Sequence, residues 1–69
     1  MQILVKIDGR ECRAEIGSSR AGWCDVFEIG PTLSGRMARV ARYSLPDSVL
    51  DHGGKVRTGG HVFEVPRNA

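Results

Sequence analysis

The fold is decided first by residues 3–16, ILVKIDGRECRAEI, in which apolar residues alternate on both sides of Asp8-Gly9. An Asp-Gly pair between two alternating runs is a strong signal for a β-hairpin with a two-residue turn. The turn fixes the pairing of the two strands, and three pairs follow from it: Val5 with Cys12, Ile3 with Ala14, and Lys6 with Glu11. This register places apolar pairs on one face and a charge pair on the other, as expected of a hairpin with one buried face.

A second hairpin is predicted near the end of the chain, around Gly59-Gly60. A two-residue turn there sets Val56 against Phe63 and Lys55 against Glu64, again with one apolar face and one charged face. The two hairpins therefore bracket the chain.

Between the hairpins, residues 23–29 are rich in aromatic and β-branched residues and read as a third strand that ends at Gly30-Pro31. Asp25 shares the parity of Trp23 and Phe27, so we expect this strand to be an edge strand or a bulged one. Trp23 is expected to anchor the core, with a role as an exposed contact residue as the alternative.

Residues 33–45 are ambiguous. On a helical wheel, an apolar arc of Leu33, Met37, Val40 and Ala41 lies opposite an arc of Arg36, Arg39, Arg42 and Tyr43. This partition favours a helix around 34–44, which Pro46 would end; the alternative is a strand that follows a turn at residues 31–35. Residues 47–53 read as one helical turn, with Asp47 as the N-cap and Gly53 in the left-handed closing position.

These elements predict a single small domain, residues 1–69, of the α+β class. Its small antiparallel β-sheet, made of two hairpins and a middle strand, is covered by one short helix. The alternative is an all-β, five-stranded SH3-like or OB-like barrel, which results if the ambiguous segment is a strand.

Composition indicates a soluble globular domain, because 41% of the residues are apolar and 26% are charged. The apolar opening is too short for a signal peptide or a membrane span, so we expect a cytoplasmic location and no membrane partner. Reduced cysteines fit that compartment. Residues 1–30 hold four basic and five acidic groups, whereas residues 31–69 hold six basic and three acidic groups, so the positive charge lies in the second half.

Neither a metal site, a cofactor nor catalysis is expected. Eleven residues separate Cys12 from Cys24 and eight separate His52 from His61, whereas zinc ligands come in closer pairs. Ser48, Asp51 and His52 are the residue types of a hydrolase triad, but they fall within one turn and cannot converge from separate elements.

The remaining functional signal is the predicted arginine stripe, formed by Arg36, Arg39 and Arg42 with Tyr43 beside it. No Asp or Glu occurs from residue 29 to 46, and such a strip suits phosphates or carboxylates. We therefore expect a non-catalytic binding module whose partner is an acidic protein surface or a nucleic acid. Chains of this size are common among inhibitors carried by phages and mobile elements, such as anti-CRISPR proteins. The alternative is a structural component of a larger assembly, including a homodimer.

Overall fold

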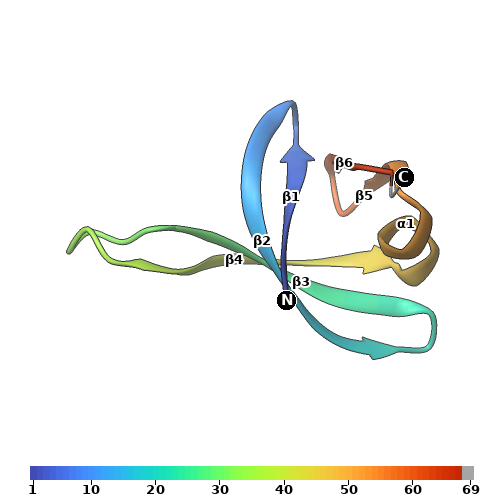
Figure 1. Ribbon diagram of the computed structural model, residues 1–69, viewed down its shortest axis with the longest axis horizontal. Helices are drawn as coiled ribbons and strands as arrows, with labels where there is room; N and C mark the ends of the chain where they lie inside the picture. Colours follow the sequence, from blue (N-terminus) through green and yellow to red (C-terminus); the bar gives the residue numbers. More distant parts are fainter. Residues whose placement is uncertain (68–69) are drawn as a thin grey trace.

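The computed structural model describes residues 1–67 and consists of one antiparallel sheet with one short helix. The sheet is strongly curled, so that the β1–β2 hairpin and the β3–β4 hairpin run in different directions in Figure 1. Its strand order is β4-β3-β2-β1-β6-β5. The elements in chain order are β1 (Gln2–Ile7), β2 (Arg10–Arg20), β3 (Trp23–Pro31), β4 (Met37–Pro46), α1 (Asp47–His52), β5 (Gly54–Thr58) and β6 (His61–Val65).

The first hairpin is confirmed in its register. Val5 pairs with Cys12, and Lys6 pairs with Glu11. The turn residues Asp8 and Gly9 have φ angles of 52° and 84°, the left-handed values that a type I′ turn requires.

The second hairpin is confirmed as well, with Val56 opposite Phe63 and Lys55 opposite Glu64. The ammonium of Lys55 lies 3.5 Å from the Glu64 carboxylate. Strand β6 then pairs with β1 through Lys6–Glu64 and Ile7–Phe63, which joins the last strand of the chain to the first. The Phe63 and Ile7 side chains are fully buried there, and burial of each stabilises the fold by about 1.5–3 kcal/mol.

Strand β3 lies inside the sheet, between β2 and β4, so the prediction of an edge strand is wrong. The prediction of a bulged strand is wrong as well, because the register shifts beside β3 place the extra residues on its neighbours, between Ala41 and Arg39 of β4 and between Ile16 and Ser19 of β2. The buried face of β3 carries Cys24 and Val26, and Trp23 on the opposite face is 45% exposed. Trp23 is therefore not the core anchor that its size predicted.

The helix predicted around 34–44 is wrong and the alternative is confirmed: a turn is followed by a strand, β4, which pairs with β3 along its length. The arginines of this segment are three residues apart, a spacing that places them on one face of a helix. A strand with one extra residue between two of them places those two on one face as well. Ala41 pairs with Glu28 and Arg39 pairs with Ile29, so Val40 is an extra residue on β4. Val40 packs over Gly30, where an added Cβ would lie 3.2 Å from its methyl group.

Helix α1 is one short element, and among residues 1–67 there is no helix long and apolar enough to cross a membrane. Asp47 is the first helical residue and Pro46 holds the N-cap position, so the predicted Asp47 cap is wrong. Gly53 has the positive φ expected of it, 80°, and its N–H donates to the Val49 carbonyl at 2.8 Å. Its ψ of 175° nevertheless differs from a left-handed helical closure.

The core lies on the concave face of the curled sheet and is built from strands rather than from a covering helix. Its buried residues are Val5, Ile7, Cys12, Ala14, Val26, Leu45, Phe63 and Val65. Val49 and Leu50 of α1 pack against one side of it. The chain is thus mostly β, an antiparallel six-stranded curled sheet with one short helix; the closed five-stranded barrel stays a prediction.

Candidate functional site

Two of the three predicted arginines share one face of the sheet. In a regular strand, residues three apart point to opposite faces, but the extra residue Val40 restores the parity of Arg39 and Arg42. Both side chains reach carboxylates on the convex, outward face, Glu15 of β2 and Asp25 of β3. The stripe therefore survives in part, on a bulged strand instead of a helix.

Arg39 is held by two contacts on this face. Its guanidinium carbon lies 4.1 Å from the centre of the Phe27 ring, in a cation–π arrangement. Its Nε donates to the Glu15 carboxylate at 3.0 Å, and its terminal nitrogen contacts the same oxygen. The side chain nevertheless remains 57% exposed, so it stays available to a partner.

Arg42 and Arg36 are less restrained. Arg42 lies 3.4 Å from an Asp25 carboxylate oxygen and is 70% exposed, a geometry that contributes little to stability. Arg36 lies in the turn that precedes β4, and no ion pair joins it to another side chain in residues 1–67. The two paired arginines are partly neutralised by acids, and Arg36 is not.

The tip of the β3–β4 hairpin projects from the body of the molecule as a two-stranded arm (Figure 1). Pairing of β3 with β2 ends at Ile29, whereas β3 and β4 continue to pair beyond that residue. We call residues 30–40 the arm. Of the six exposed large apolar side chains in residues 1–67, three lie in the arm: Leu33, Met37 and Val40.

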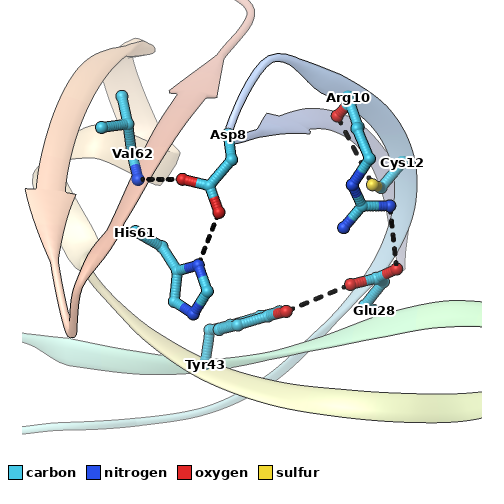
Figure 2. A network of polar contacts seen from close by, with 7 residues as sticks. All are labelled: Asp8, Arg10, Cys12, Glu28, Tyr43, His61 and Val62. Carbon is cyan, nitrogen blue, oxygen red and sulfur yellow. Dashed lines mark hydrogen bonds and ion pairs between the residues drawn. The ribbon is translucent and has the colours of Figure 1, made fainter.

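Tyr43 lies on the concave face and does not join the arginines. Its hydroxyl donates to the Glu28 carboxylate at 3.2 Å, and Arg10 approaches the other Glu28 oxygen at 3.8 Å (Figure 2). Partial burial, followed by the Glu28 carboxylate, raises the pKa of the Tyr43 hydroxyl. Tyr43 is thus a structural donor that links β4 to β3 and the start of β2.

A second group of polar contacts, centred on Asp8, lies beside this one and reaches the second hairpin (Figure 2). One Asp8 oxygen lies 2.6 Å from Nδ1 of His61, and the other accepts the Val62 backbone N–H at 2.9 Å. These two hydrogen bonds lower the pKa of the Asp8 carboxyl. The first turn is thereby fastened to β6.

Within the described part of the chain, no three side chains of His, Cys, Asp or Glu come close enough together to hold a metal ion. Both cysteines are free and buried. Burial, and next the Glu28 carboxylate, raises the pKa of the Cys12 thiol, which keeps it protonated and unreactive.

Sequence reasoning missed the arm, because the helical reading assigned Leu33, Met37 and Val40 to a buried face. Gly35, which has a φ of 84° in the turn of the arm, was the available signal for a hairpin. Comparison with protein-family models, with curated proteins and with solved structures found no match to this chain.

Proposed function

We propose that this chain is a non-catalytic binding module that docks on an acidic surface of a partner protein through the arm and the neighbouring face of β4. The observation that carries the proposal is the exposure of Leu33, Met37 and Val40 beside Arg36 and Arg39. An isolated two-stranded hairpin is only marginally stable in water, and exposed large apolar side chains concentrated in one projecting segment indicate an interaction site. A partner would cover this surface and order it.

A protein partner is favoured over a nucleic acid by the composition of this surface. Met and Arg are enriched in protein interfaces, where an apolar centre is surrounded by polar groups. Binding to phosphates depends on many free cations, but Arg39 and Arg42 each face a carboxylate of the same chain. The expected complement is an acidic patch with an apolar centre.

The test is affinity capture from a lysate of cells that carry the gene, with the partners identified by mass spectrometry. The double variant Leu33→Ser/Met37→Ser should lose the specific partner, and Arg36→Glu should weaken its binding. Leu4→Ser is the matched control, since Leu4 is an exposed apolar residue outside the arm. Equal capture by wild type and the arm variants contradicts the proposal.

Nucleic-acid binding is tested in parallel with duplex DNA and single-stranded RNA. Affinity that falls with salt, with a log-log slope near −0.9 per phosphate contacted on DNA, would place the partner in that class instead. Inhibition of the partner by covering its surface, which the size of the chain suggests, stays a prediction.

Self-assembly is the second candidate function. It is favoured by the two strands at the ends of the sheet order, β4 and β5, each of which pairs with one strand in residues 1–67. Exposed edges of this kind are templates for pairing with another chain. Sedimentation at two protein concentrations separates a monomeric binder from an oligomer.

A further inference from the structure

The outer edge of β4 offers a row of backbone groups to a partner. The Asp47 N–H donates to the Gly22 carbonyl, so Gly22 and Asp47 form a hydrogen-bonded pair that extends the β3–β4 ladder. In an antiparallel ladder such pairs recur at every second residue. The backbone N–H and C=O groups of Leu45 and Tyr43 therefore point toward β3. The residues between them direct their backbone groups away from β3. The Thr32 N–H donates to the Arg36 carbonyl, so beyond the bulge the backbone groups of every second residue of β4, counted from Arg36, also point toward β3. The outward residues are Met37, Arg39, Arg42 and Ser44.

The two faces of this edge differ in chemistry. On the convex face the edge carries Arg39 and Arg42, and β4 contains no acidic residue. On the other face, Ala38 and Ala41 are small and partly buried, which leaves room beside them for larger apolar side chains. A strand added here would meet two exposed arginines on one side, each of which also contacts a carboxylate of the same chain, and two small apolar residues on the other.

We propose that β4 receives an extended segment of the partner protein as an additional antiparallel or parallel strand, and that this segment alternates acidic and apolar residues. The inference rests on the proposed function and specifies the mode of binding. Main-chain hydrogen bonds would supply affinity, and the alternating side chains would supply specificity. The acidic residues pair with Arg39 and Arg42, and the apolar residues cover the alanines.

A second copy of the chain fits this edge poorly. Pairing two β4 strands through their outer edges brings Arg39 and Arg42 of both copies together. Glu15 and Asp25 neutralise these arginines only in part, and like charges across a ladder are destabilising. Charge complementarity therefore favours a segment from another protein.

The probe is an eight-residue capped peptide of alternating glutamate and valine, titrated into the isotopically labelled protein and followed through backbone amide shifts. We expect shifts concentrated at residues 37–44, and at least about ten-fold weaker binding of a lysine–valine peptide, because charge decides between the two. Absence of binding at millimolar peptide, or shifts centred on another strand, overturns the proposal.

Ser44→Pro separates the backbone edge from charge. Proline is tolerated on an edge strand where its missing N–H faces solvent, so this variant keeps the β3–β4 ladder and both arginines. It should weaken the glutamate–valine peptide at least about ten-fold, whereas Ser44→Ala should stay within about two-fold of wild type. Unchanged binding by a folded Ser44→Pro protein contradicts strand addition.

A second variant keeps the proposal testable if the proline variant fails to fold. Arg39→Gln/Arg42→Gln retains the backbone edge and should bind the glutamate and lysine peptides equally. Retained preference for glutamate overturns the charge assignment, and a dimer that Ser44→Pro dissociates assigns the edge to a second copy instead. If capture of the lysate partner still depends on Leu33 and Met37 while the peptide tests fail, only strand addition is lost and the proposed function stands.

Discussion

Tyr43 and Phe63 meet edge to face, with ring centres 5.2 Å apart, although their strands β4 and β6 are separated by three others in the sheet order. The contact forms because the sheet curls until β4 and β6 face each other across the core. His61 adds a second edge contact to Tyr43 at 5.3 Å. These rings therefore fix the curvature of the sheet with side-chain packing in place of a backbone ladder.

Substitution of Tyr43 tests this role. Tyr43→Phe retains the ring contact and loses the hydrogen bond to Glu28, so it should lower the free energy of unfolding by about 1 kcal/mol. Tyr43→Ala also removes the ring and should cost about 3 kcal/mol, which approaches the whole stability of a domain this small. Urea unfolding followed by Trp23 fluorescence measures both.

Met37→Ala is the control for the tyrosine series, since Met37 lies in the same strand and is 59% exposed. It should change the free energy of unfolding by less than about 0.5 kcal/mol. A smaller loss for Tyr43→Ala than for Tyr43→Phe would show that the ring does not stabilise the curl.

Gly53 is required because the backbone of Pro66 and Arg67 passes close to it. A Cβ at this position would lie 2.6 Å from Cα of Arg67 and 2.8 Å from the Pro66 carbonyl oxygen, at a φ of 80°. Gly35 has a similar φ, 84°, with no atom within 4 Å of its Cβ position. Gly35→Ala should thus cost only the conformational strain, about 1 kcal/mol, and Gly53→Ala about 2 kcal/mol more, because backbone cannot turn aside as a side chain does. Equal midpoints of thermal unfolding for the two variants would refute the close approach.

The sequence was most informative where local chemistry decides structure. Asp8-Gly9 and Gly59-Gly60 each specify a two-residue turn. Such a turn allows its two strands only one pairing register, so the sequence predicts each residue pair of both hairpins. Residues 37–46 were harder because a bulge and a helix both place residues three apart on one face. Arg39 and Arg42 therefore share a face both in a helix and in a bulged strand, and only long-range pairing with β3 decides between the two structures.

The arrangement of the predicted site residues followed from the sequence only in part. Arg39 and Arg42 do share a face, as the stripe required, whereas Tyr43 points to the opposite one. Their pairing with Glu15 and Asp25 depends on which strands become neighbours, and no local signal carries that information. The exposed arm was missed for the same reason, since its exposure follows from the point at which β2 stops pairing with β3.

Asp8 should make stability depend on pH in the acidic range. Its pKa in the folded protein lies below the ordinary value of 3.8, so the unfolded chain binds its proton first as the pH falls. The contribution of Asp8 is therefore complete above about pH 5 and is lost as the pH falls through 3.8 and then through the lowered pKa. Asp8→Asn is the matched variant, because asparagine tolerates the positive φ and can still accept the Val62 N–H. The difference in free energy of unfolding between the two proteins, measured at low ionic strength, should shrink as the pH falls below about 5. Parallel pH profiles would contradict the assignment to Asp8.

Both cysteines should react with a thiol reagent only when the protein opens. Cys12 is buried with a raised pKa, and its thiol donates to the Arg10 carbonyl at 3.4 Å, while Cys24 is 1% exposed. Because the thiolate is the reacting species, the native protein should react about 10²–10⁴ times more slowly than the chain in urea, the ratio set by a stability of about 3–5 kcal/mol. Leu33→Cys supplies the control, since a thiol at the fully exposed tip of the arm should react at the rate of a free cysteine without unfolding. Release of the coloured product from Ellman's reagent follows all three thiols. Native Cys12 or Cys24 reacting as fast as the thiol at position 33 would mean that the concave core opens to solvent without loss of the fold.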